Sequence, residues 1–288
     1  MNADFSADPS VQGHPAAVGH SLSCWAFRDS PMSDLPPSLS GFIDEAEVSE
    51  KTLLLLNRTE PEPFVDLLSK AFEKQSVTVT EKQIPEGTDN LVCLIEDGQV
   101  VATTPLSELA EAFLLVNVDR YRTGTRQSDL GSFPDVLTGL DDVEFVVEGY
   151  PHTDREKLLL VLISRFIEHR ALANGSGELH STFQRLSRLD DEYGTRTMYE
   201  RLGESDVETH VYGVRDDPAA VADIDVTVHD GMTEEYRRSW VVVFTPDSDT
   251  DDHVALVAIE IDRNVWRSVW TYDVDRTERI RSYMRQRF

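Results

Sequence analysis

The chain has 288 residues and a hydrophobic fraction of 40%, enough for one large or two ordinary domains, each with a core. Its 27 lysines and arginines stand against 53 aspartates and glutamates, which gives a formal net charge of −26. This excess argues against nucleic acid as a partner, because no basic stripe is available to displace counterions, and no apolar run approaches the roughly 20 residues of a membrane-spanning helix.

The basic residues are mostly arginines, and only five lysines occur. An acidic, lysine-poor surface is typical of a protein kept soluble in multimolar salt, where the Debye length falls to about 3 Å or less. Residues 1–31 have no basic start followed by an apolar core, so they do not resemble a signal peptide. We therefore predict a cytoplasmic protein from a salt-accumulating halophile.

The pattern up to residue 150 predicts a disordered or mis-started tail over 1–40 and a first α/β unit over 41–150. Short apolar runs bounded by polar residues predict strands, and apolar residues at helical spacing predict helices. In chain order we expect a strand over 52–57, a helix over 61–75, strands within 76–82 and 90–104 with an Asp97-Gly98 turn, and a helix over 105–117.

A second unit is predicted over 151–288 and begins with a long helix that is apolar over most of its circumference. This helix starts at a Thr-Asp cap and stops at Asn174-Gly175. In chain order we expect a helix over 153–173, a strand over 177–184, a helix over 190–205, strands within 207–213, 224–229, 238–246, 254–262 and 265–273, and a basic helix over 275–288.

The predicted strands are rich in valine and isoleucine and show little alternation, which is typical of a sheet covered on both faces. We therefore predict an α/β fold with a mostly parallel or mixed central sheet flanked by helices, in two α/β units.

Signatures of common enzymes are absent from the sequence. It contains no GxxxxGK[ST], no GxGxxG after a strand and no GxSxG. The eight histidines lack the spacing of metal ligands, and Cys24 and Cys93 cannot form a disulfide framework. We predict no catalytic residue and no metal site, and the residues leave the cofactor unknown.

A polar and aromatic set in the second unit remains, and much of it follows predicted strands, where ligands of α/β sheets bind. Arg165 and Glu168 lie three residues apart on one helix and can pair. The alternative is a buried network that holds helix to sheet, with the aromatic residues as part of the core. The candidate ligand-binding residues are Arg165, Glu168, Gln184, Arg185, Tyr199, Tyr212, Trp240, Trp270 and Tyr272.

Ordered segments of this unit resemble the DICT sensory domain, a family found with diguanylate cyclases and two-component systems. The matching segments are Ser164-Arg165-Phe166-Ile167-Glu168, Phe183-Gln184, Val211-Tyr212-Gly213, Trp240 and Trp270-Thr271-Tyr272. The resemblance covers about 153–288, and residues 41–150 look like the N-terminal part of stand-alone haloarchaeal members. Ser239 stands where the family tends to have glutamate, so a role of that glutamate is in doubt here.

The resemblance implies a signal-input domain for light or a small molecule, without catalysis. We expect a cytoplasmic sensory protein in which Arg185, Gln184 and Arg165 bind a polar or anionic ligand beside an aromatic wall of Tyr212, Trp240, Trp270 and Tyr272. A separate signalling partner would read the bound state. The alternative is an interaction module without ligand, which docks a partner or a second copy through the basic C-terminal helix. Neither reading sets the oligomeric state.

Overall fold

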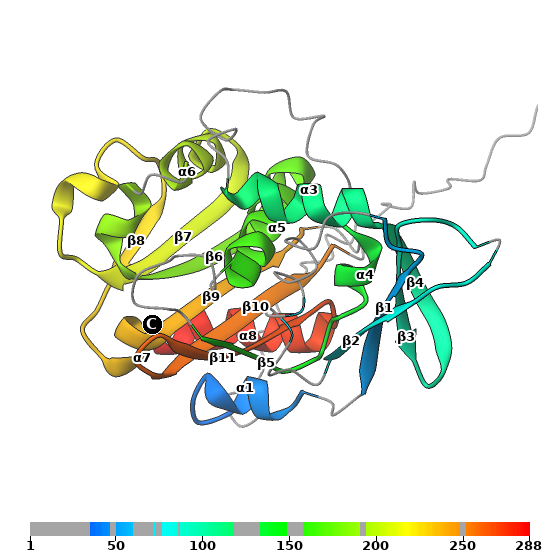
Figure 1. The fold of residues 1–288 in the computed structure, drawn as a ribbon. Helices are drawn as coiled ribbons and strands as arrows, with labels where there is room; N and C mark the ends of the chain where they lie inside the picture. The colour runs from blue at the N-terminus through cyan, green and yellow to red at the C-terminus, as the bar shows by residue number, and fades with distance from the viewer. Residues whose placement is uncertain are drawn as a thin grey trace, which may run out of the picture.

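The computed structural model describes residues 35–46, 50–59, 69, 72, 77–85, 87–117, 133–148, 158–190, 194–247 and 252–288. Most of the predicted tail and of the predicted helix over 61–75 lie outside these residues. The protein has an α/β fold with two mixed sheets, as predicted (Figure 1). Within the described part of the chain, no helix is long and apolar enough to cross a membrane.

The smaller sheet has four strands in the order β2-β1-β3-β4. β1 is parallel to β2 and antiparallel to β3, which is antiparallel to β4. Asp97 and Gly98 form the predicted turn between β3 and β4 with φ of 50° and 75°, values that suit a two-residue hairpin. The elements are β1 (Lys51–Leu56), β2 (Val77–Lys82), β3 (Leu91–Glu96), β4 (Gln99–Pro105) and the helices α3 (Leu106–Asn117) and α4 (Asp135–Thr138).

The larger sheet has seven strands in the order β5-β11-β10-β9-β6-β7-β8. β6, β7 and β8 are parallel, and β9, β10, β11 and β5 continue from β6 in antiparallel pairs. Its strands are β5 (Phe145–Glu148), β6 (Ser176–Arg185), β7 (Asp206–Val214), β8 (Thr227–Asp230), β9 (Ser239–Thr245), β10 (Val254–Asp262) and β11 (Val265–Thr271).

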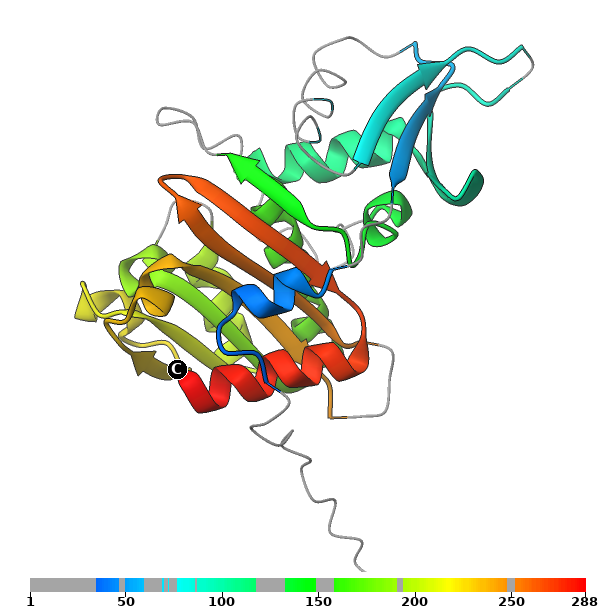
Figure 2. The ribbon, with the colours of Figure 1, turned by 90° about the horizontal axis from the view of Figure 1, so that it is seen from below.

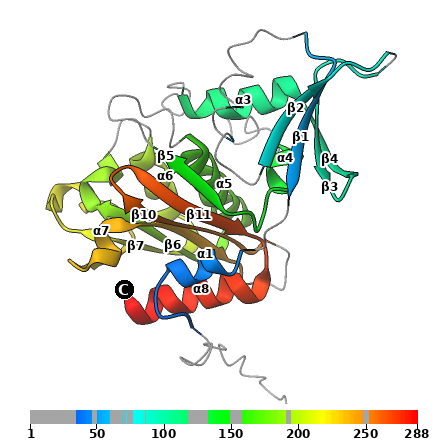
Figure 3. The same cartoon turned by 60° about the horizontal axis from the view of Figure 1, so that its bottom comes forward.

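Helices cover both faces of the larger sheet, which explains why its central strands are apolar throughout (Figures 2 and 3). In β9, Val242 and Phe244 join the apolar cluster of α5, while Val241 and Val243 join that of α8. One face carries α5 (Leu158–Asn174) and α6 (Thr195–Gly203), with the short helices η4 (Leu186–Asp190) and η5 (Pro218–Val221) nearby; the other carries α8 (Val274–Arg287), α1 (Ser40–Asp44) and α7 (Glu234–Arg238).

Three predicted boundaries are wrong. Leu39, placed in the tail, is fully buried in the apolar cluster beneath α8. β5, placed in the first unit, pairs with β11 and is the edge strand of the larger sheet. The helix predicted over 190–205 is shorter, because η4 ends at Asp190 and α6 begins at Thr195. The end of the predicted tail and the end of the predicted first unit therefore belong to the core around the larger sheet, since burial of apolar side chains depends on the whole chain.

Candidate functional site

The predicted ligand groups on α5 and α6 bind one another. Arg165 donates to Glu168 Oε2 at 2.7 Å, and its other terminal nitrogen contacts the Thr195 hydroxyl. Tyr199 donates its hydroxyl to Glu168 Oε1 at 3.1 Å. Arg165, Glu168 and Tyr199 are all buried. The pairing of Arg165 with Glu168 is confirmed, and these residues form a network that joins α5 to α6.

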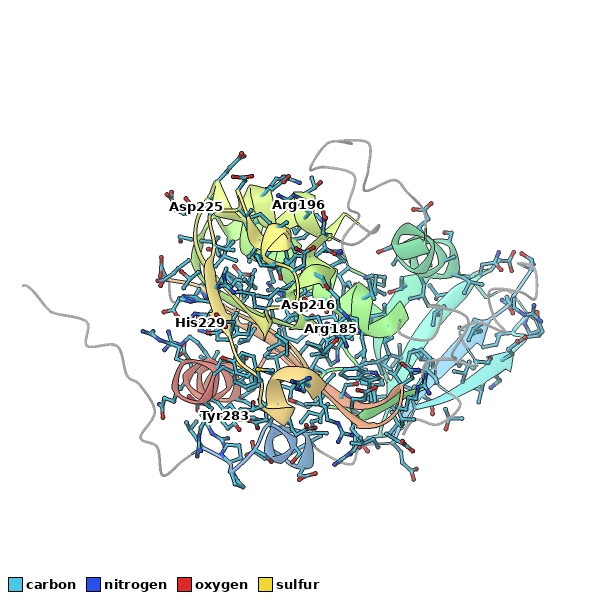
Figure 4. All side chains as sticks on the ribbon, turned by 90° about the vertical axis from the view of Figure 1, so that its left-hand side faces the viewer. Arg185, Arg196, Asp216, Asp225, His229 and Tyr283 are labelled. Atoms are coloured by element: carbon cyan, nitrogen blue, oxygen red, sulfur yellow. The ribbon has the colours of Figure 1, made fainter. Side chains whose placement is uncertain are left out.

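The polar groups at the end of β6 have two different environments. Gln184 is buried, with φ of 48°; its amide donates to the Ser239 carbonyl at 2.6 Å and accepts from Arg188. Arg185 is exposed and lies beside Asp216 (Figure 4). The same Asp216 accepts a hydrogen bond from the Ser187 hydroxyl. Gln184 therefore shapes the chain at the end of β6. Arg185, unlike the buried Arg165, faces solvent.

The predicted aromatic wall does not form, because the four rings lie on opposite faces of the sheet. Trp240, Trp270 and Tyr272 pack in the cluster of α5, whereas Tyr212 packs in that of α8. Trp270 is buried and donates to the Leu140 carbonyl at 2.6 Å, and Trp240 donates to Ser164 at 2.9 Å. The expectation that Tyr212 shares a ligand wall with the tryptophans is wrong. Side chains on one strand alternate between faces, and on β7 it is Val211 that packs in the cluster of α5, so Tyr212 faces the other side.

Tyr212 instead belongs to a stack of rings on β6, β7 and β8 that the sequence interpretation missed. His180 on β6 lies directly opposite His210 on β7, and Tyr212 on β7 lies opposite His229 on β8. The ring centroids of His180 and His210 are 4.5 Å apart, with an angle of 5° between the ring planes. Those of Tyr212 and His229 are 4.4 Å apart, with an angle of 9° between the planes. We call these four residues the ring ladder.

Hydrogen bonds connect the ring ladder internally and to two glutamates. His180 contacts the Tyr212 hydroxyl through Nδ1 at 2.8 Å and Glu178 Oε2 through Nε2 at 3.1 Å. His210 contacts His229 Nε2 through Nδ1 at 3.0 Å and Glu208 Oε1 through Nε2 at 3.0 Å. Both histidines therefore direct Nε2 at the glutamate two residues earlier on the same strand.

Glu178 links the ring ladder to α8. Its Oε1 lies 3.2 Å from Arg281 Nη1 and 3.3 Å from Arg285 Nη1. Burial alone would raise the pKa of Glu178, but the hydrogen bond to His180 and the charges of the two arginines outweigh it and lower that pKa to about 2. Burial lowers the pKa of His180 to about 4, against the hydrogen bond to Glu178. At neutral pH the carboxylate is ionised and the imidazole is neutral.

One end of the ring ladder reaches solvent. His180 is completely buried, while the His210 side chain is 12% exposed and that of Glu208 67% exposed. Burial and the neighbouring His210 lower the pKa of His229. Figure 4 shows His229 on the sheet and Tyr283 on α8. A cluster of imidazoles and carboxylates, open at one side, can bind a cation or a polar molecule.

A sequence signal for this cluster exists. The segments "GELHSTF" (177–183) and "VETHVYG" (207–213) each contain a Glu-x-His triplet in a predicted strand. The period of two in a strand places each glutamate and its histidine on one face. The structure adds the register, in which Glu178 lies opposite Glu208 and His180 opposite His210.

Comparisons with known proteins identify no family. No family model and no curated protein matches the chain. A solved structure of polyphosphate kinase from Porphyromonas gingivalis is similar over 82% of this chain and 45% of that chain, at 11% identity and a TM-score of 0.28. This chain thus spans less than half of that protein, and a likeness so low carries no argument about activity. The resemblance to DICT domains stays a prediction.

Proposed function

We propose that this chain is a cytoplasmic, non-enzymatic signal-input protein that binds a small ligand at the ring ladder and passes its bound state to a separate signalling partner. The observation that carries the proposal is a continuous set of contacts from solvent-exposed Glu208 to α8: Glu208 hydrogen-bonds His210, the His210 ring stacks on His180, and His180 hydrogen-bonds Glu178, which pairs with Arg281. The DICT resemblance and the acidic, lysine-poor composition support the sensory role and a halophilic source.

The contacts give a route by which a bound ligand would change the position or dynamics of α8. A ligand at His210 and His180 would compete for Nε2 and loosen the contact between His180 and Glu178. Because Glu178 also pairs with Arg281 and Arg285, a change at the carboxylate would shift the position or the dynamics of α8. A ligand moves such an equilibrium only by its differential affinity for the two states.

The alternative, a docking module that uses the basic C-terminal helix, has less support. The helix packs Ile280, Tyr283 and Met284 into the core. Its arginines have partners within the chain: Arg276 with Asp142, Arg279 with Glu45, Arg281 and Arg285 with Glu178, and Arg287 over the Tyr283 ring. Deletion of this helix would therefore unfold the protein, and a loss of association would not report on a docking role.

The first test is analysis of the contents of the protein purified in multimolar salt. We would measure released organic molecules and metals by mass spectrometry and record the absorption spectrum of the intact sample. One bound compound or ion per chain is the expected result. A colourless protein without any stoichiometric content would overturn the proposal.

A second measurement tests transmission. Hydrogen exchange of α8 should differ between the loaded and the stripped protein, while exchange of α3, the helix that follows β4 of the smaller sheet, serves as the internal control. Identical exchange of α8 in both states would refute the route through Glu178.

A further inference from the structure

The two Glu-x-His triplets bring metal-ligating groups together. Glu178, His180 and His210 each offer one ligand atom, and these three atoms all lie within 4.8 Å of one another. Ligands about 2.0–2.2 Å from a tetrahedral zinc ion lie roughly 3.3–3.5 Å apart, so shifts of about 1 Å would bring the three atoms onto one ion. Such shifts need only small side-chain rotations on neighbouring strands.

We propose that Glu178, His180 and His210, with Glu208 as the fourth ligand, bind a divalent transition-metal ion of the zinc type. The inference rests on the proposed function and names the ligand of that sensor. Glu208 qualifies because its Oε1 lies 3.0 Å from His210 Nε2 and its side chain reaches solvent.

The groups behind the ligands can hold both imidazoles in the state that a metal requires. Metal coordination through Nε2 requires the ring proton on Nδ1, and this proton needs an acceptor. His180 Nδ1 has the Tyr212 oxygen at 2.8 Å, and His210 Nδ1 has His229 Nε2 at 3.0 Å. Both Nε2 atoms face a carboxylate and donate to it when no metal is bound. An ion would replace these two hydrogen bonds and move each ring proton to Nδ1, where the Tyr212 oxygen and His229 Nε2 can accept it.

The charges around Glu178 permit a cation. Its Oε1 faces both arginines, whereas Oε2 faces His180 and has one arginine contact, to Arg285 Nη1 at 3.4 Å. Oε2 is therefore the oxygen that an ion would take once Arg285 turns away. Arg281 also pairs with Glu278 at 2.7 Å, and the Arg285 side chain is 45% exposed, so it is free to turn toward solvent. The nearby carboxylates, those of Glu178, Glu208 and Glu278, outnumber the two guanidinium groups of Arg281 and Arg285.

The donor set selects the class of ion. Two imidazole nitrogens with carboxylate oxygens suit zinc and its transition-metal neighbours, whereas magnesium and calcium prefer oxygen ligands alone. Selectivity is essential to the test, because a protein with 53 acidic residues attracts any divalent cation to its surface.

The experiment is a titration of the chelator-stripped full chain with Zn²⁺, in multimolar KCl with excess Mg²⁺ to occupy the surface carboxylates. Calorimetry should give one Zn²⁺ per chain. Co²⁺ should give the visible absorption bands of a tetrahedral nitrogen and oxygen site. Uptake that excess Mg²⁺ suppresses would mean surface carboxylates only and would overturn the proposal.

Three variants locate the site. His210→Gln should weaken Zn²⁺ binding by at least about tenfold, and Glu208→Gln should weaken it and change the Co²⁺ spectrum. His253→Gln is the matched control, because His253 also lies near a glutamate, 3.4 Å from Glu278, but outside the ring ladder. Equal losses in His253→Gln and His210→Gln would refute the site. Should His210→Gln fail to fold, Glu208→Gln decides, since its side chain is exposed: an unchanged affinity and spectrum would refute it.

The outcome also separates this inference from the proposed function. A stoichiometric organic compound in a chain that does not bind Zn²⁺ would refute the metal site and leave the sensor proposal intact. A chain with neither content would refute both.

Discussion

Tyr199 donates its hydroxyl to Glu168 Oε1 at 3.1 Å and thereby ties α6 to α5 beneath the larger sheet. The same carboxylate accepts from Arg165 at 2.7 Å, and all three side chains are buried. The ion pair lies within α5, and its bonds to Tyr199 and Thr195 join α5 to α6. Removal of one partner of the pair leaves a buried charge without compensation. The network is therefore structural.

Glu168→Ala should lower the free energy of unfolding by about 3–5 kcal/mol, because it strips the buried Arg165 of its opposite charge. Tyr199→Phe should cost less, about 1–2 kcal/mol, since it removes one hydrogen bond to a charged group. Denaturant unfolding followed by circular dichroism measures both changes. Arg185→Ala is the control: its side chain is exposed, so the expected change is within about 0.5 kcal/mol. A cost for Arg185→Ala equal to that of Glu168→Ala would contradict this assignment.

Much of the fold could be predicted from local patterns. The apolar run at 52–57, the Asp97-Gly98 turn and the amphipathic segment at 105–117 became β1, the β3-β4 turn and α3. Each depends on neighbours a few residues away. The positions of Leu39 and β5 could not be predicted, because both pack or pair with segments more than 100 residues further along the chain.

The candidate site was harder to predict than the fold. Helical spacing was sufficient to pair Arg165 with Glu168, but not to show that Tyr199 completes their set. For Tyr212, the sequence gives its parity with Glu208 and His210 but not which face of the sheet that parity occupies. The Glu-x-His triplets acquire meaning only when β6 and β7 are known to be parallel neighbours in register.

Gly177 should be far less tolerant of substitution than Gly175, although both belong to the same Asn-Gly-Ser-Gly turn. A Cβ on Gly177 would lie 2.4 Å from the Thr245 carbonyl oxygen and 2.8 Å from Pro246 Cα, and its φ is +113°. Gly175 has φ of +80° with nothing near its Cβ position, so Gly175→Ala should cost only the left-handed backbone penalty of about 1–2 kcal/mol. Gly177→Ala should exceed that cost clearly in urea unfolding. An equal loss of unfolding free energy in the two variants would mean that β6 and β9 can move apart to admit the Gly177→Ala methyl group without strain.

Stability should rise with KCl concentration from about 0.1 M into the multimolar range, because screening shortens the Debye length from about 10 Å to 3 Å at 1 M. The net charge of −26 makes self-repulsion a large term at low salt. Thermal unfolding in a KCl series measures the effect. The double variant Glu204→Gln, Asp206→Asn removes two exposed charges near the end of α6 and should reduce the slope with salt. A melting temperature independent of KCl would refute the role assigned to the acidic surface.

Acid should destabilise the stripped protein in two stages, and the ring ladder contributes to both. The pKa of His180 is about 4 in the folded chain, against an ordinary value of 6.5. Between these values the unfolded chain takes up a proton that the folded chain refuses, so stability falls as pH falls, by up to about 1.4 kcal/mol per pH unit. His169 adds to the same stage. Burial and the charges of Arg165 and Arg201 lower its pKa to about 4 as well.

Glu178 governs the second stage. Its pKa of about 2 lies below the ordinary 4.5, so the stability it contributes is complete above pH 4.5 and is lost as pH falls toward 2. His180→Gln should flatten the decline between pH 6.5 and 4, because glutamine does not titrate there. It should also raise the pKa of Glu178, because a neutral amide replaces the imidazole next to the carboxylate. Denaturant unfolding from pH 7 to 3, with chelator present, measures both stages. If the variant and the wild type lose stability in parallel between pH 6.5 and 4, then His180 is protonated in the folded chain and the ring ladder is less buried than its contacts indicate.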